Sequence, residues 1–144
     1  MSDECGAMSD ECITMNEEQG KGTDAGGKRL KERTREFALQ VIHMYAALPK
    51  STVAQVLGKQ LLRSGTSVGA HYREGTRSRS HAEFVSKLEG ALQEPEESRY
   101  WLELLEAERF VPTAVLTPLV QEADELTAMI IASVRTVKAR DKTK

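Results

Sequence analysis

The chain has 144 residues, with 20 Lys and Arg against 22 Asp and Glu and a net charge of -2. A hydrophobic content of 40% and a charged content of 29% are typical of a single globular domain and exclude a fibrous protein. The sequence contains no run of about 18 apolar residues, so no transmembrane helix is predicted. The acidic N-terminus lacks the apolar core of a secretory signal, so we expect a cytoplasmic protein with no membrane partner.

Residues 1–27 form an acidic segment that contains seven acids and one base, Lys21. It is polar and rich in glycine, and such a segment buries too little apolar surface to offset the entropy of ordering it. We therefore expect a disordered tail over 1–27 and a folded domain over 28–144. The pentapeptide at 1–5 recurs at 8–12 and places the two cysteines, Cys5 and Cys12, seven residues apart. That spacing, with no histidine nearby, argues against a metal site.

Apolar residues recur at helical spacing from residue 29 onward, and proline and glycine mark the breaks. The first two predicted helices cover about 29–48 and 53–77, and Ser51 or Thr52 can cap the second. A third helix is predicted over about 80–110, where Ser80 and Glu83 have the spacing of a capping box. Pro95 in its middle predicts a kink, with a division into two helices as the alternative. A fourth helix begins within 112–118 and ends near 138.

Four amphipathic helices without a convincing strand predict an all-α fold, an antiparallel up-down-up-down four-helix bundle. Gly65 and Gly69 provide a surface of small residues for close helix packing. The fourth helix carries a heptad of apolar residues from Leu116 to Val137 and a second stripe that includes Ile131 and Val134. Two stripes favour a further buried contact, such as another subunit, although a wide core-facing surface also explains them. Tyr100 and Trp101 are interpreted in the same way, as core or subunit packing.

The sequence contains no recognisable catalytic or cofactor motif. The phosphate-binding loop, the nucleophile elbow and the paired Glu-x-x-His motifs of di-iron bundles are all missing from it. We therefore predict no enzyme activity, no metal and no cofactor.

The charges are distributed unevenly along the folded part. Seven bases and three acids lie between Lys50 and Glu89, whereas residues 94–108 contain six acids and one base. Arginine side chains suit phosphate groups, so the basic stretch is a hypothetical nucleic-acid contact. An alternative remains open, in which these bases pair with the acidic stretch. The candidate contact residues are Lys59, Arg63, Arg73, Arg77 and Arg79.

Residues 60–75, which read QLLRSGTSVGAHYREG, resemble the signature of the four helix bundle proteins encoded in 23S rRNA intervening sequences. The resemblance extends over about 30–138 and includes Arg77, Ser80 and residues 97–105. It implies an antiparallel bundle that often assembles as a homopentamer. It also implies similarity to the accessory protein of diversity-generating retroelements, a basic pentameric barrel that binds a reverse transcriptase and nucleic acid. His71 stands where the family usually has Asn.

Two functional hypotheses follow. The first is a non-enzymatic homo-oligomer that binds RNA or a nucleic-acid-processing protein through the basic residues. The second is a protein-interaction scaffold without nucleic-acid binding, which uses the second stripe of the last helix and the surface around 100–105.

Overall fold

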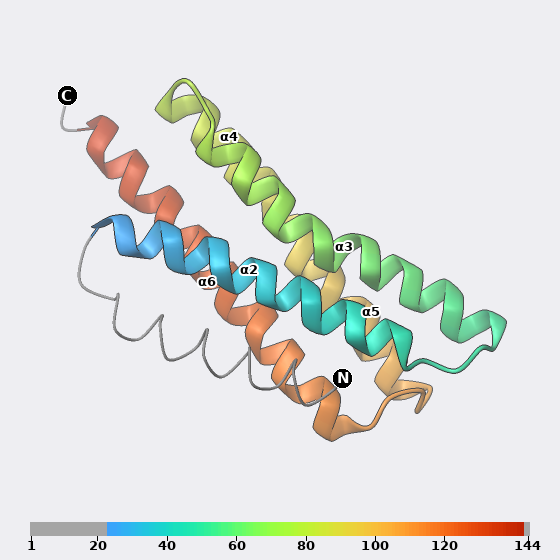
Figure 1. Ribbon diagram of the computed structural model, residues 1–144. Coiled ribbons are helices and arrows are strands. Elements are labelled where there is room, and N and C mark those ends of the chain that lie inside the picture. Colours follow the sequence, from blue (N-terminus) through green and yellow to red (C-terminus); the bar gives the residue numbers. More distant parts are fainter. Residues whose placement is uncertain (1–22, 143–144) are drawn as a thin grey trace.

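The computed structural model describes residues 23–142, and within that range it contains helices and no strands (Figure 1). The all-α prediction is confirmed. Residues 1–22 of the predicted tail, with the repeated pentapeptide and both cysteines, lie outside the described residues. Residues 23–27 of that tail belong to the first helix, which begins six residues before the predicted start. The helices are α2 (Thr23–Ala46), α3 (Thr52–Thr76), α4 (His81–Ala91), α5 (Gln93–Ala107) and α6 (Thr113–Lys142).

The helices pack in a ring in which α4 and α5 together occupy one position. The α2 helix contacts α3 and α6, and both α3 and α6 contact α4 and α5, whereas no diagonal contact joins α2 to α4 or α5 within the described residues. Figure 1 shows α2, α3, the rod formed by α4 and α5, and α6 running in alternating directions, consistent with the predicted up-down-up-down bundle. The start of α2, the turn between α3 and α4, and the end of α6 all lie at the same end of the bundle (Figure 1).

The predicted third helix is interrupted at Leu92, so the division into α4 and α5 is the observed arrangement. Pro95 lacks an N–H group, and its ring would collide with the carbonyl group four residues earlier, that of Ala91. The α4 helix ends at that residue. Leu92 retains helical backbone angles (φ -65°, ψ -23°), so the interruption bends the rod without reversing the chain.

The core follows one apolar stripe from each helix. Phe37 and Val41 from α2 are fully buried against Leu61, and Leu126 and Ile130 from α6 complete the centre. The predicted heptad of α6 is buried from Leu116 to Ile130. Beyond that point Val134, which was assigned to the second stripe, continues the core, whereas Ser133 and Val137 are half-buried.

The glycines of α3 allow close helix packing, as the sequence predicted. A Cβ atom at Gly65 would lie 2.9 Å from Val41 Cγ2, and one at Gly69 would lie 3.2 Å from Thr34 Oγ1, so both residues face α2. A Cβ atom at Gly75 would collide with Leu88 of α4. Gly75 therefore lets the last turn of α3 pack closely against α4, one residue before α3 ends.

Side-chain and backbone caps define the helix ends. Ser51 Oγ accepts a hydrogen bond from the Ala54 N–H group at 3.4 Å, and Ser80 Oγ accepts one from the Glu83 N–H group at 3.1 Å. After α5 the chain turns at Arg109, whose φ of 60° is the left-handed conformation that usually requires glycine. The Phe110 N–H group then bonds to the Leu105 carbonyl oxygen at 3.1 Å.

Candidate nucleic-acid interface

The outward side of α3 carries a line of positions that contains bases and no acid. The positions are four, three, four, three and four residues apart, which keeps them on one side of a helix with 3.6 residues per turn. Five of the six side chains are exposed, and Thr66 is half-buried. We call this set the α3 stripe: Lys59, Arg63, Thr66, Ala70, Arg73 and Arg77.

The bases of the stripe differ in whether the chain neutralises them. Arg63 pairs with Glu97 of α5, and its Nη1 atom lies 3.8 Å from Glu94 Oε2. The alternative reading, that bases pair with the acidic stretch, is therefore confirmed for Arg63. The three other bases form no ion pair with any residue of the described chain: Lys59, Arg73 and Arg77.

Arg79 lies in the turn that follows the stripe. Its backbone N–H group donates to Glu83 Oε2 at 3.2 Å, while its exposed guanidinium group makes no ion pair within residues 23–142. Beside this turn, His81 Nδ1 lies 2.6 Å from Asp141 Oδ1, which brings the end of α6 against the start of α4. Four of the five predicted contact residues thus share one helix side, and the fifth extends it at the end of the bundle.

A group of paired charges borders the stripe on the side of α4 and α5. Lys87 Nζ donates to Glu74 Oε1 at 2.5 Å, and this hydrogen bond lowers the pKa of Glu74 and raises the pKa of Lys87. His71 Nε2 lies 3.4 Å from Glu94 Oε1. The carboxylate of Glu74 thus pairs with a lysine of the neighbouring helix and not with an arginine of the stripe.

The α5 helix and the first half of α6 are rich in acids, of which Glu94 and Glu97 border the stripe. Residues 93–125 contain nine acids and two bases, Arg99 and Arg109. Arg99 Nη1 donates to Asp124 Oδ1 at 3.0 Å, which joins α5 to α6. Arg33 of α2 bonds to Glu122 of α6 and, at 2.5 Å, to Glu125. Burial opposes the charge of Arg33, yet the two carboxylates raise its pKa.

The residues predicted for packing or subunit contact fall into two groups. Gly65, Gly69 and Val134 are buried inside the bundle. Tyr100 is 53% exposed, and its ring centroid lies 5.1 Å from that of Trp101. Trp101 is half-buried, and its indole N–H group has no hydrogen-bond partner in the described residues. The remaining residue, Ile131, is half-buried on α6.

Within residues 23–142, no group of three His, Cys, Asp or Glu side chains is arranged to hold a metal ion. The helices of this part are also too short or too polar to cross a membrane.

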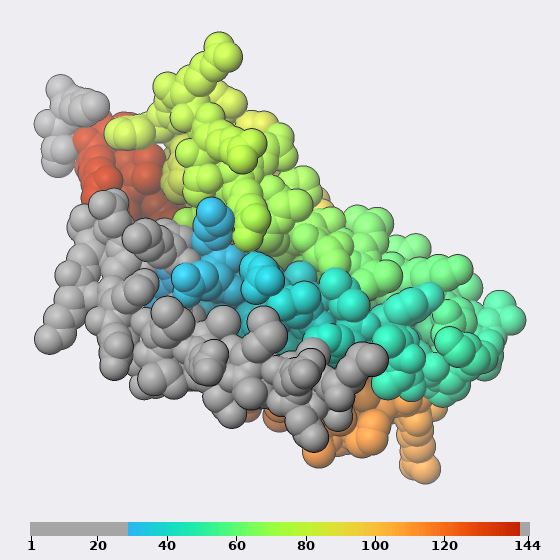
Figure 2. Space-filling view, viewed as in Figure 1, coloured from blue at the N-terminus to red at the C-terminus, as the bar shows by residue number. Residues whose placement is uncertain are grey.

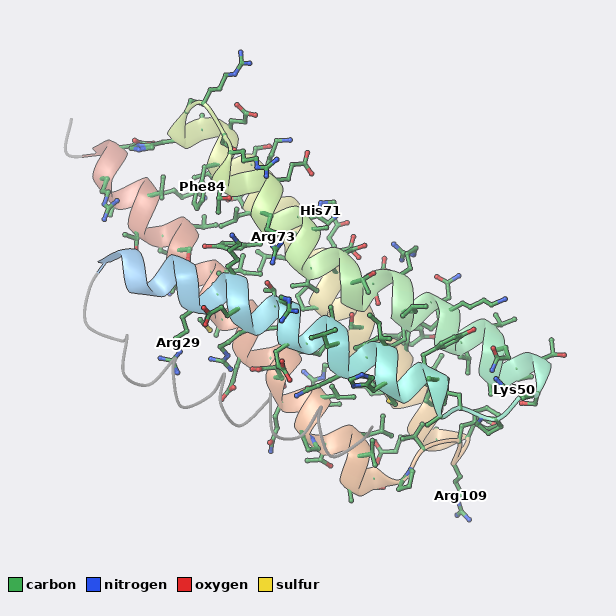
Figure 3. The ribbon with its side chains drawn as sticks, in the orientation of Figure 1. Arg29, Lys50, His71, Arg73, Phe84 and Arg109 are labelled. Carbon is green, nitrogen blue, oxygen red and sulfur yellow. The ribbon has the colours of Figure 1, made fainter. Side chains whose placement is uncertain are left out.

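Figure 3 labels Arg73 on the α3 side of the bundle and Lys50 and Arg109 at the far end. Figure 2 shows that side chains of α2 and α3 cover much of the face in view. The sequence reasoning chose the bases but missed that Thr66 and Ala70 connect them into one line. The alternating intervals of three and four residues were the signal that could have revealed it.

Comparison with known proteins gives a family and a structural relative. The sequence profile described as 23S rRNA-intervening sequence protein matches residues 29–132. A crystal structure from Bacteroides thetaiotaomicron, of a protein of unknown function from the S23 ribosomal protein family, is 34% identical in sequence. It superposes with a TM-score of 0.69 over 73% of this chain and 97% of that one. None of the curated proteins compared with the chain is significantly similar to it.

Proposed function

Because the chain belongs to the 23S rRNA-intervening sequence protein family, we propose that it is a non-enzymatic, homo-oligomeric accessory protein that binds RNA or nucleoprotein. The α3 stripe and Arg79 would contact the phosphates. The acids of α6 would face away from them, because α6 lies across the bundle from α3. Cytoplasmic location belongs to the same proposal.

The observation that carries this proposal is the lack of internal partners for most of the basic side chains on the stripe. Lys59, Arg73 and Arg77 are exposed and make no ion pair within the described chain. Arginine offers a fork of N–H donors that matches two phosphate oxygens, and neutralising phosphates releases bound counterions. A few such contacts give weak binding for one subunit.

Assembly would strengthen that binding. A ring of subunits repeats the stripe, and several weak contacts to one RNA gain from the high effective concentration of the second contact. The family resemblance implies a homopentamer. The exposed ring of Tyr100 and the half-buried Ile131 supply apolar surface for such contacts.

Fluorescence anisotropy with a structured RNA and with duplex DNA tests the proposal. At about 50 mM salt we expect binding that weakens steeply by about 200 mM, because several phosphates are contacted. The variant Arg73→Glu, Arg77→Glu should lose at least about tenfold in affinity and flatten the salt dependence. The matched control, Lys50→Glu with Arg109→Glu, changes the net charge equally at the far end of the bundle (Figure 3). Equal binding by the two variants would contradict the proposal.

A protein-interaction scaffold without nucleic-acid binding is the second candidate. The buried indole N–H group of Trp101 lacks an acceptor in the described chain, and Val56 of α3 is 54% exposed. A partner that inserts an acceptor beside Trp101 would satisfy that group. Under this alternative, Tyr100→Ala should abolish capture of a protein partner, while the wild-type protein should show no affinity for RNA at about 50 mM salt.

A further inference from the structure

The bases of the α3 stripe lie within reach of an anionic segment of the same chain. Residues 1–22 contain six acids and one base, Lys21. The acids occur as three adjacent pairs at 3–4, 10–11 and 17–18, each pair seven residues after the previous one. Three bases of the stripe make no ion pair within the described residues: Lys59, Arg73 and Arg77. The charges of the segment and of the stripe are opposite in sign.

The attachment point makes contact geometrically feasible. Thr34 of α2 lies beside Gly69 of α3, and the two helices run in opposite directions, so the start of α2 lies at the end of the bundle that holds Arg77 (Figure 1). A chain of 22 residues can span up to about 70 Å when fully extended. The stripe spans 18 helical residues, or about 27 Å. A segment attached at Thr23 can therefore cover most of the stripe.

Covalent attachment also favours the contact thermodynamically. A tether of this length gives the acidic pairs an effective concentration of about 1 mM beside the stripe. Charges that each interact weakly in water are then engaged for a substantial part of the time at low ionic strength. A second protein copy or a free peptide would need a comparable bulk concentration to compete.

We infer that residues 1–22 dock on the α3 stripe as an internal polyanion, in place of nucleic-acid phosphates. The docking itself stands on charge and reach, and its regulatory consequence rests on the proposed function. The segment would exclude weakly charged ligands and yield to a nucleic acid that offers many phosphates together. It would thus raise the selectivity of the site at the expense of affinity.

The cysteines allow a direct test in the full-length protein. Cys5 and Cys12 are its only cysteines, so Cys12→Ser leaves one labelling site in the acidic segment. A nitroxide on Cys5 should broaden the amide NMR signals of Ala70, Arg73 and Arg77 at about 50 mM salt. The broadening should vanish at about 500 mM salt, because screening weakens exposed charge pairs. Broadening confined to α5 or α6, or no broadening at low salt, would overturn the inference.

A neutralised segment provides the second measurement. The variant keeps the size and polarity of the side chains and removes six charges. It should abolish the broadening and bind RNA about tenfold more tightly than wild type at about 50 mM salt, with the difference lost at high salt. Unchanged RNA affinity would overturn the competition. If neither protein binds RNA while the wild type shows the broadening, the docking stands and the proposed function fails. The substitutions are Asp3→Asn, Glu4→Gln, Asp10→Asn, Glu11→Gln, Glu17→Gln and Glu18→Gln.

Discussion

The inward and outward sides of α3 are used in opposite ways. On the inward side, Gly65 and Gly69 leave room for Val41 and Thr34 of α2. On the outward side, Arg73 and Arg77 extend from the C-terminal end of the same helix with no ion-pair partner in the described residues. The stretch that carries the family resemblance thus specifies close packing on one side and leaves charge available on the other.

This contrast separates the residues that make the fold from those that are candidates for binding. A substitution on the inward side should change the free energy of unfolding. One on the outward side should change affinity and its salt dependence, with little effect on stability. Each prediction below tests that division.

The largest expected effect is on the inward side. Gly65→Val should lower the free energy of unfolding by about 3 kcal/mol, because overpacking a tight seam strains both helices. The neighbour is Val41, whose branched side chain cannot rotate clear: its Cγ2, Cγ1 and Cβ atoms would lie 2.9, 3.1 and 3.3 Å from the new Cβ. Chemical denaturation measures the change.

The same substitution on the outward side is the control. Ala70 is exposed on the same helix, so Ala70→Val should cost only about 0.5 kcal/mol, the difference in helix propensity. If the two variants were equally destabilised, the division between the two sides of α3 would be wrong.

The second effect is a gain of affinity on the outward side. Thr66 and Ala70 interrupt the stripe, so Thr66→Lys with Ala70→Arg should complete it. We expect about tenfold tighter RNA binding at about 50 mM salt, and a salt dependence steeper by about 1.5 units for two more phosphate contacts. Anisotropy titrations at several salt concentrations provide both values.

A matched pair of substitutions on α6 controls for net charge. Ala114→Arg with Thr117→Lys adds the same residues at exposed positions near the start of that helix. This control should leave the affinity within about twofold of wild type, since long-range effects of exposed charges are screened by salt. An equal gain from both pairs would show that net charge alone governs binding.

The fold was largely predictable, because periodic apolar residues and caps act over short distances in the sequence. Ser51 and Ser80 cap α3 and α4 as expected, and the break near Pro95 follows from the chemistry of one residue. Which charged side chains form ion pairs with one another was not predictable. Whether Arg63 meets Glu97, 34 residues away, depends on the relative position of two helices, which no local pattern specifies.

The third effect contrasts two kinds of glycine. A Cβ atom at Gly90 of α4 would meet no atom within 4 Å, unlike those at the glycines of α3. Gly90→Ala should therefore raise the free energy of unfolding by about 0.5–1 kcal/mol, because alanine restricts the unfolded chain and favours the helix. A loss of stability in thermal denaturation would mean that Gly90 faces a contact outside the described residues.

The smallest effect concerns the exposed pair that borders the stripe. The hydrogen bond from Lys87, and then its charge, lower the pKa of Glu74 below its ordinary value of 4.5. A carboxyl group whose pKa is lower in the folded state stabilises the protein above its unfolded pKa. That contribution disappears as the pH falls through the lowered pKa.

Glu74→Gln should therefore reduce the melting temperature slightly at pH 7, and the difference from wild type should disappear as the pH falls through the lowered pKa. The pair is exposed and screened, so the difference at pH 7 should be smaller than any effect above and should shrink in high salt. A variant that also lost RNA affinity would place Glu74 within the interface. The boundary between paired charge and available charge would then run along α3 itself, one residue from Arg73.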